Sequence, residues 1–266
     1  MKLITLGMVS LLAAGAVGMA CASPVNLIQN GDFSQTTNGA STPTQFGTGS
    51  LNGYTATQFI TGWTGNDGYE IWYPSATAAT TVNATGEWTS TGQEKVWGPI
   101  SAIPNGATTF VGLDGDQTPG VQSSIGQTLD MLVPGTKYTV SFDWAAGQLQ
   151  SRTGITTSNI LVSFGDLQQS TDTVTNPSGG FTGWMSASFT FVADNSSAFL
   201  NFLSVGTPNG LPPMAFLTNV SVTHDVPEPP VLAMFGGGLL GLGLLAMLAR
   251  RRETHRRDAD GNSVNC

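Results

Sequence analysis

Three aromatic residues and one carboxylate follow one another in residues 68–73, which read GYEIWY. If the segment is a strand, Tyr69, Ile71 and Tyr73 share one face, whereas Glu70 and Trp72 share the other. An aromatic ring packs well against the C–H face of a sugar ring, and neutral polar groups bond the sugar hydroxyls. The segment therefore indicates a sugar-binding site.

Two further tryptophans, Trp88 and Trp97, could extend this site, because both occur in loop-like sequence with glutamates nearby. The alternative is burial, which is usual for aromatic residues of a β-sandwich and is favoured for Trp63 and Trp144. For Trp72, Trp88 and Trp97 both interpretations stay open. The candidate ligand-binding residues are Tyr69, Glu70, Trp72, Trp88 and Trp97.

Three aspartates form a candidate calcium site. Asp114 and Asp116 are separated by one glycine, a spacing that lets two carboxylates approach one ion, and Asp32 could contribute a third. Calcium takes about six to eight oxygen ligands, so two acids fall far short of a full site and a solvated turn is the favoured alternative. A structural Ca²⁺ is the one cofactor that the sequence leaves open.

Catalytic constellations are missing from the sequence. A glycosidase needs two carboxylates at a defined separation, but pairing along the sequence says nothing when fourteen acids lie between residues 23 and 228. His224 is the only histidine in that range, which argues against a Ser-His-Asp triad or a His-rich zinc site. The chain is therefore predicted not to be an enzyme.

The charge balance excludes one class of partner. Only Lys95, Lys137 and Arg152 are basic between residues 23 and 228, against the fourteen acids. Three scattered cations cannot neutralise a phosphate backbone, so nucleic acid is not expected as a partner. Charged residues make up 10% of the chain, against about 25% in an average globular protein. The surface must instead consist of neutral polar residues and glycine.

Alternation at period two is frequent in this sequence, and helical periodicity is nearly absent. In residues 137–146, for example, Tyr138, Val140, Phe142 and Trp144 share one face. The other predicted strands are residues 26–33, 69–73, 108–113, 121–132, 160–164, 185–191, 198–205 and 216–223. Turn formers separate them, and residues 36–61 are expected to be a long loop or insertion. Many short strands without intervening helices predict an antiparallel β-sandwich over residues 23–225.

The N-terminal residues 1–22 have the pattern of a secretory signal peptide. Lys2 precedes an apolar stretch, and Ala20-Cys21-Ala22 is a small-residue cleavage site. A lipidated Cys21 is the weaker alternative, because Gly18 stands where lipoproteins usually carry leucine. The domain is expected to be exported and to lack disulfides, since Cys266 is the only other cysteine.

The C-terminal part reads as a linker, a span and a basic tail. Residues 226–230 are rich in proline, and residues 231–249 contain nineteen consecutive uncharged residues, long enough to cross a bilayer as one helix. Arg250, Arg251 and Arg252 would stop the helix and mark the cytoplasmic side, with residues 250–266 as the tail. The fold class is thus all-β plus one C-terminal transmembrane helix.

Pro227-Glu228-Pro229, the apolar span and the arginine cluster together resemble the PEP-CTERM sorting signal of bacteria that make exopolysaccharide. The resemblance implies export, a membrane-anchored precursor in the cell envelope and processing near the motif by an exosortase. The released protein would reach the cell surface or the extracellular matrix. Such signals usually end soon after the arginines, whereas residues 253–266 follow here. An ordinary, unprocessed anchor is the alternative.

The sandwich resembles the galactose-binding-like jelly rolls, which include several carbohydrate-binding modules. The similar segments are NLIQNGDF at residues 26–33, GW at 62–63, FVGLDG at 110–115, GQTL at 126–129, PGTKYTVSF at 134–142 and FLTNVSV at 216–222. Members often hold a structural calcium with a Glu after the opening Gly-x-Phe and an Asp in the closing strand. Ser34 and Thr218 occupy those positions here, so two of the carboxylates are missing.

Three functions follow as hypotheses. The favoured one is a non-catalytic module that binds polysaccharide of the surface or matrix. The first alternative is a structural protein of the biofilm matrix or of adhesion without a defined ligand site, which predicts buried aromatic residues. The second alternative, a glycoside hydrolase, requires two acids that face each other across a cleft.

Overall fold

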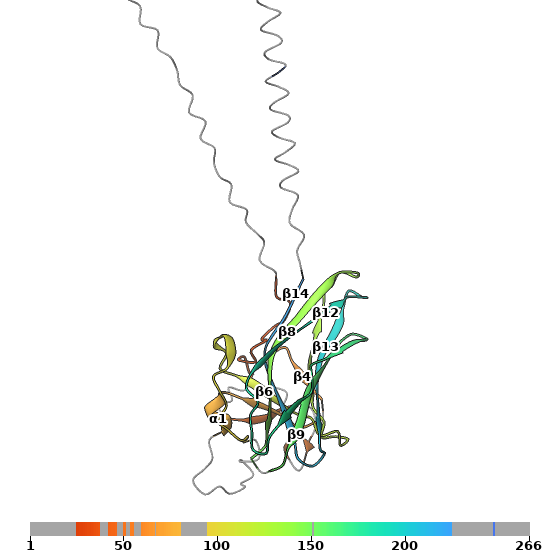
Figure 1. Ribbon diagram of the computed structural model, residues 1–266. Coiled ribbons are helices and arrows are strands. Elements are labelled where there is room, and N and C mark those ends of the chain that lie inside the picture. Colours follow the sequence, from red (N-terminus) through yellow and green to blue (C-terminus); the bar gives the residue numbers. More distant parts are fainter. Residues whose placement is uncertain are drawn as a thin grey trace, which may run out of the picture. The chain divides into compact units, whose positions relative to one another are not determined.

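The structure, a computed structural model, describes residues 25–37, 42–46, 50–51, 54–55, 60–66, 68–80, 95–150, 152–224 and residue 247. Nearly all of its regular elements are strands (Figure 1). They are β1 Thr44–Phe46, β2 Ser50–Leu51, β3 Tyr54–Thr55, β4 Thr64–Gly65, β5 Glu70–Tyr73, β6 Phe110–Asp114, β7 Ser124–Leu129, β8 Lys137–Gln148, β9 Thr156–Phe164, β10 Leu167–Ser170, β11 Val174–Asn176, β12 Met185–Val192, β13 Ala198–Thr207 and β14 Pro213–His224. The two short helical turns are α1 Ala76–Thr80 and the 3-10 turn Pro104–Gly106.

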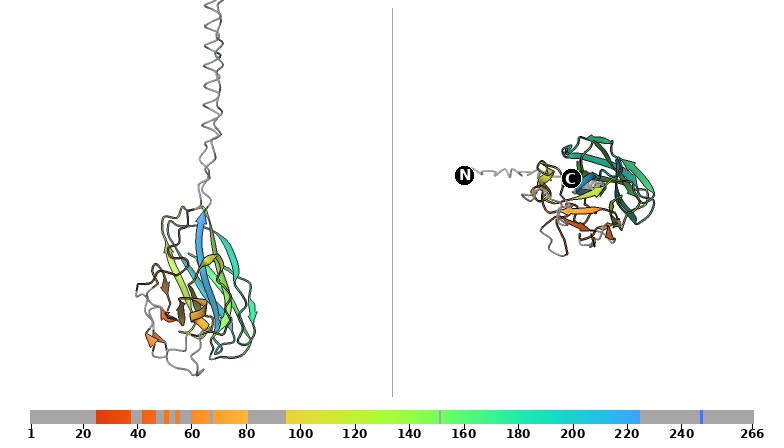
Figure 2. Two further views of the ribbon diagram at one scale, coloured as in Figure 1. Left: turned by 90° about the vertical axis from the view of Figure 1, so that its left-hand side faces the viewer. Right: turned by 90° about the horizontal axis from the view of Figure 1, so that it is seen from below.

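Two antiparallel sheets face each other (Figure 2). The first sheet has the order β1-β5-β6-β14-β8-β12. The second has the order β10-β9-β13-β7-β4, and β11 also pairs with β9. β2 and β3 form a separate two-stranded ribbon. The predicted all-β, antiparallel architecture is therefore confirmed.

The core between the sheets consists of the inward side chains of both. On β8 these include Tyr138, Val140, Phe142 and Trp144, the residues that the alternation placed on one face. Phe142 meets Phe202 of the second sheet edge to face, with ring centroids 5.1 Å apart. Aromatic and β-branched side chains at every second position thus fill the space between the sheets.

A second apolar cluster covers the outer face of the first sheet. Phe110, Phe216 and Tyr73 are its buried centre, and Ile100, Ile103, Phe181 and Trp184 pack against it from two loops. The covering explains the burial pattern along β8, which alternates in its first half and is buried on both faces in its second half. The first sheet is therefore partly buried on both sides.

The structure corrects two strand predictions. Residues 26–33 form no strand, because the chain turns at Asn30 and Phe33, both of which have positive φ. One backbone hydrogen bond, from Leu27 N to Val222 O, holds this segment beside β14. Within residues 36–61, expected to be loop, β1 pairs with β5 at the edge of the first sheet. A segment without alternating apolar and polar residues can still form a strand when it pairs with a neighbouring strand.

Candidate functional site

The aromatic segment at residues 69–73 lies in the core. The predicted alternation is present, since Tyr69 belongs to the outer cluster and Trp72 to the core between the sheets. Both of these faces are covered, however: Tyr69 is 7% exposed, Glu70 0% and Trp72 3%. Trp72 Nε1 donates a hydrogen bond to Phe33 O at 2.9 Å, which fixes the ring inside. The expectation that these three residues form an exposed sugar platform is therefore corrected.

The other two candidate tryptophans lie outside this strand. Trp97 is half-buried, and its Nε1 donates to Arg152 O at 2.8 Å, while its ring lies against Gly179. It belongs to the loop that covers the outer face of the first sheet. Trp88 lies outside the described residues.

The three candidate calcium ligands are divided between the two ends of β6. Asp114 and Asp116 follow each other at its C-terminal end, whereas the carbonyl oxygen of Asp32 accepts a hydrogen bond from Thr109, just before its N-terminal end. Five strand residues separate the ends by roughly 15 Å. Among the described residues, no three His, Cys, Asp or Glu side chains come together as metal ligands.

The Asp114 and Asp116 carboxylates hold their own loop together. Asp114 Oδ1 accepts from Asp116 N at 2.8 Å. Asp116 Oδ1 accepts from Thr118 N and Oγ1 at 3.0 and 2.7 Å, and Oδ2 accepts from Gly210 N. These bonds tie the loop after β6 to the loop after β13.

Burial raises the pKa of Asp114 from its ordinary 3.8 to about 7, and the nearby Asp116 charge adds to this rise. The hydrogen bond from Asp116 N and the charge of Arg152 act in the opposite direction. In contrast, hydrogen bonds from Gly210 and Thr118 outweigh desolvation and lower the pKa of Asp116.

These shifts predict a pH dependence of stability. The folded protein holds a proton on Asp114 between pH 3.8 and about 7 that the unfolded chain releases. The free energy of unfolding should therefore fall by about 2 kcal/mol as the pH rises from about 5 to about 7. Urea unfolding at several pH values measures this slope. Asp114→Asn keeps an acceptor for Asp116 N but cannot ionise, so this variant should lose the slope; a slope of unchanged size would contradict the assignment.

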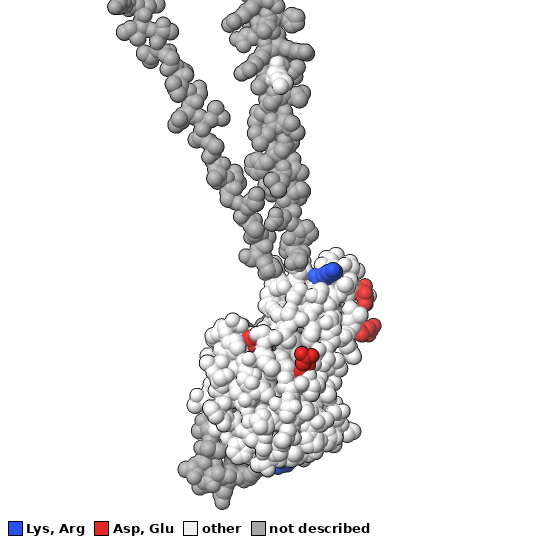
Figure 3. Space-filling model, in the orientation of Figure 1, with Lys and Arg blue, Asp and Glu red and all other residues white. Residues whose placement is uncertain are grey.

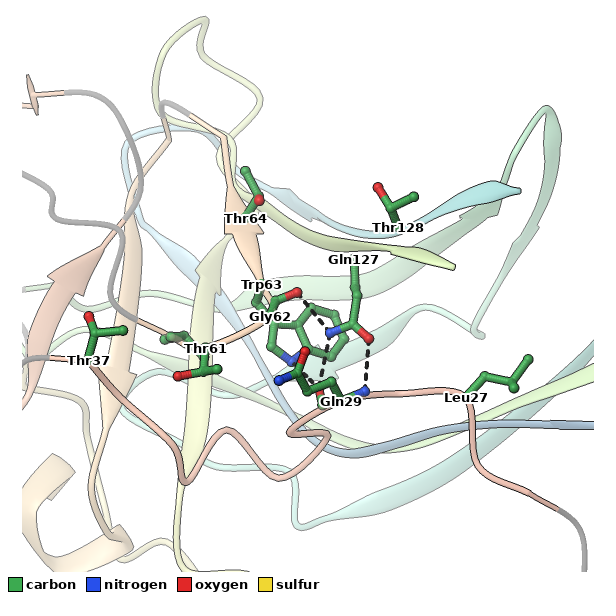
Figure 4. A pocket seen from close by; sticks show the side chains of 10 residues that line it. Leu27, Gln29, Thr37, Thr61, Gly62, Trp63, Thr64, Gln127 and Thr128 are labelled. Atoms are coloured by element: carbon green, nitrogen blue, oxygen red, sulfur yellow. Dashed lines mark hydrogen bonds between the residues drawn. The ribbon is translucent and has the colours of Figure 1, made fainter. Parts of the chain in front are cut away.

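A groove of about 640 Å³ lies at the edge of the second sheet (Figure 4). Three stretches of chain meet there: the N-terminal segment, the residues that lead into β4, and the end of β7. The lining residues are Leu27, Gln29, Thr37, Ile60, Thr61, Gly62, Trp63, Thr64, Gln127 and Thr128. Trp63 is 2% exposed, and its Nε1 donates to the carbonyls of Gln29 and Asn30.

Gln127 connects the three stretches. Its Nε2 donates to Gln29 O at 3.0 Å and to Gly62 O at 2.8 Å, and its Oε1 accepts from Gln29 N at 2.9 Å. Gly62 has a φ of +82°, and a Cβ there would lie 3.0 Å from both glutamine side chains. Because its amide is already bonded within the protein, Gln127 shapes the groove, and other side chains must meet a ligand.

The exposed side chains of the groove are neutral and polar. Gln29, Thr64 and Thr128 are exposed, and Figure 4 shows the two threonines pointing away from the Gln29–Gln127 pair. Amide and hydroxyl groups both donate and accept hydrogen bonds without carrying charge. No ionisable side chain occurs among the described residues that line the groove. The arrangement suits an uncharged ligand rich in hydroxyls.

From the sequence, Trp63 was expected in the core, and Gln29, Gln127 and Thr128 were named only as parts of fold motifs. Thr64 was not singled out, and none of these residues was identified as a site residue. Gln29 and Gln127 are 98 positions apart in the chain. No local pattern relates them, since a strand's periodicity assigns faces and says nothing about which distant segment lies alongside.

The remaining sequence predictions concern parts of the chain that are not described. The signal peptide, Pro227-Glu228-Pro229, the apolar run 231–249 and Arg250, Arg251 and Arg252 all lie there. Within the described part, no helix has the length and apolar character needed to span a bilayer.

Comparison with known proteins gives one family and several distant structures. A family model described as "Protein of unknown function (DUF642)" matches residues 74–212. The CBM22-1 xylan-binding domain of Paenibacillus barcinonensis Xyn10C is similar at 11% identity and a TM-score of 0.35, over 78% of this chain and 99% of that one. TmCBM61, solved with beta-1,4-galactotriose, is similar at 15% identity and a TM-score of 0.30, over 45% and 73%. No curated protein sequence matches the chain.

Proposed function

We propose that this chain, which belongs to the DUF642 family of proteins of unknown function, is a non-catalytic carbohydrate-binding protein. The ligand would occupy the groove lined by Gln29, Thr64 and Thr128. The observation that carries the proposal is the composition of this groove, whose exposed side chains carry amides and hydroxyls at the edge of the second sheet. Such groups orient a sugar through its hydroxyls.

A titration tests the proposal. The purified protein is mixed with xylan, β-1,4-galactan and the producing organism's own exopolysaccharide, with and without calcium, and binding is measured by calorimetry. Tryptophan fluorescence is a second readout, because Trp63 lines the groove. Saturable binding is expected. A calcium requirement for binding would support the structural Ca²⁺ that the sequence leaves open.

The double variant Gln29→Ala with Thr128→Ala should weaken glycan binding by about thirtyfold, because each of the two lost hydrogen bonds contributes about 1 kcal/mol. Gln168→Ala is the matched control, since Gln168 is an exposed amide on β10, outside the groove. Equal affinities of the double variant and the control would contradict the placement of the site.

A structural matrix protein is the second candidate, and the burial of Tyr69 and Trp72 favours it. A protein of this kind would occupy the polysaccharide layer without a ligand site. It predicts that no glycan binds saturably and that loss of the protein weakens the cohesion of the biofilm. The same titration therefore decides between the two candidates.

Export and sorting complete the proposal. The motif Pro227-Glu228-Pro229 with its apolar run and arginines supports exosortase processing of a membrane-anchored precursor, followed by residence at the cell surface or in the matrix. Glu228→Ala is expected to leave export intact and to trap the unprocessed precursor in the membrane. Immunoblots of membrane and medium fractions measure this. An unchanged mature size and location would indicate an ordinary anchor instead.

A further inference from the structure

The outer face of the second sheet carries no ionised side chain on its central strands. Its strands alternate between buried and half-exposed residues, as in β9 and β13. The outward residues of β4, β7, β9 and β13 are Thr64, Ser124, Gly126, Thr128, Thr157, Asn159, Leu161, Ser163, Phe199, Asn201, Leu203, Val205 and Thr207. Charged side chains are also sparse and scattered on the face of the molecule that Figure 3 displays.

Among the described outward residues of these four strands, Phe199 is the one aromatic side chain. It is 46% exposed, although most large apolar side chains of the sandwich are buried. Its ring covers Gly126 of the neighbouring strand: a Cβ at Gly126 would lie 2.3 Å from Phe199 Cζ and 2.7 Å from Cε1. The ring thus occupies the space that a side chain at position 126 would need.

The ring adjoins the groove. Thr128, which lines the groove, is the direct cross-strand partner of Phe199. Thr64, which also lines it, is the partner of Gly126 on the other side of β7. Neighbouring strands lie about 5 Å apart, so the groove and the ring form one continuous surface across β4, β7 and β13.

We propose that Phe199 is a stacking subsite for a sugar ring next to the groove, and that the ligand is an uncharged polysaccharide bound along its length. This inference rests on the proposed function. An open groove that continues over the outer face of a sheet accommodates the interior of a chain, whereas a closed pocket would select a chain end. A sugar ring would pack on the exposed face of Phe199 while Thr64 and Thr128 bond its hydroxyls.

The surface also selects against charged polymers. A uronate or sulfate group placed on this face would lose hydration without gaining a cationic partner, because the described residues of the face include no lysine or arginine. The Phe199 ring could instead have a purely structural role, because an aromatic ring over a cross-strand glycine covers exposed backbone and stabilises the sheet. Such a role requires no ligand, so binding measurements distinguish a structural ring from a sugar-binding one.

The test compares wild type with Phe199→Ala, Phe199→Trp and Leu203→Ala. Leu203 lies on the same face of β13 and controls for the loss of a surface apolar group. Calorimetry measures binding to xylan, β-1,4-galactan, hydroxyethylcellulose and the anionic polygalacturonate, and to xylobiose and xylohexaose. Thermal melting shows that each variant is folded.

Phe199→Ala is expected to weaken binding of the uncharged polymer and the longer oligosaccharide about tenfold, while Phe199→Trp and Leu203→Ala bind as wild type does. The shorter oligosaccharide should be unaffected. If wild type binds and Phe199→Ala binds equally well, the subsite is refuted while the proposed function stands. Preferential binding of polygalacturonate would refute the uncharged ligand class. Absence of any glycan binding by wild type would refute the proposed function and this inference with it.

Discussion

Replacing Trp72 by alanine is expected to lower the free energy of unfolding by about 4 kcal/mol, because a buried indole is removed from a packed core. Trp72 is 3% exposed and belongs to the core between the sheets. The substitution also leaves the carbonyl of Phe33 without the indole N–H that it accepts at 2.9 Å. Urea unfolding followed by circular dichroism measures the loss. Glycan affinity of the folded fraction should stay unchanged.

Trp97→Ala is the matched control for Trp72. The Trp97 ring is half-buried in a covering loop, so its removal should cost about 1 kcal/mol. The stability loss of Trp72→Phe should lie between those of Trp72→Ala and Trp97→Ala, because phenylalanine keeps a buried ring but cannot donate the hydrogen bond to Phe33 O. If Trp72→Ala were as stable as Trp97→Ala but had lost glycan binding, Trp72 would have to be exposed in solution.

Phe216→Ala is also expected to lower the free energy of unfolding by about 4 kcal/mol. This substitution removes a ring from the outer cluster, whereas Trp72→Ala removes one from the core between the sheets. Phe216 is 0% exposed. Its ring lies 5.3 Å from Phe110, 6.1 Å from Tyr73 and 6.4 Å from Trp184, measured between ring centroids. Its removal would undermine the loops that pack on the first sheet. Hydrogen exchange provides a local readout, because Trp97 N donates to Gln148 O and these residues adjoin Val96 and Leu149 of the outer cluster in the chain.

Leu203→Ala is the control for Phe216→Ala. Leu203 is a half-buried residue on the outer face of the second sheet, which no described element covers, so its loss should cost about 1 kcal/mol. In Phe216→Ala the Trp97 amide should also exchange faster than in Leu203→Ala. Equal stability and equal exchange in the two variants would show that the outer face of the first sheet is open in solution.

Much of the fold could be predicted from local patterns. Alternation identified the long strands from β5 to β9 and from β12 to β14, and it assigned the faces of β8 correctly. It failed at residues 26–33, where positive φ at Asn30 and Phe33 turns the chain. It also missed β10 and β11, which are short strands paired at the edge with β9. Edge strands acquire their conformation from a neighbour, so their own sequence carries little signal.

The candidate site was much less predictable. The sequence identified a rich aromatic segment at Tyr69 and Trp72, but a period of two cannot reveal whether a face meets solvent or another layer. The groove depends on Gln29 and Gln127, which become neighbours only when the N-terminal segment closes against β7. Phe199 is exposed for a related reason. Alternation in residues 198–205 places Phe199 and Phe202 on opposite faces, but it cannot reveal which of these faces meets solvent and which meets the core.

The sequence by itself determined an all-β domain with alternating faces and a surface poor in charge, because strand periodicity and composition are local properties. It also supplies the motif and the apolar run on which the sorting proposal rests. Only the tertiary structure decided which faces are covered, since this depends on the loops that pack on the outer cluster. It likewise brought Gln29 to Gln127 and Phe199 over Gly126. Such contacts between distant segments follow from sheet order and packing, which no single stretch of sequence encodes.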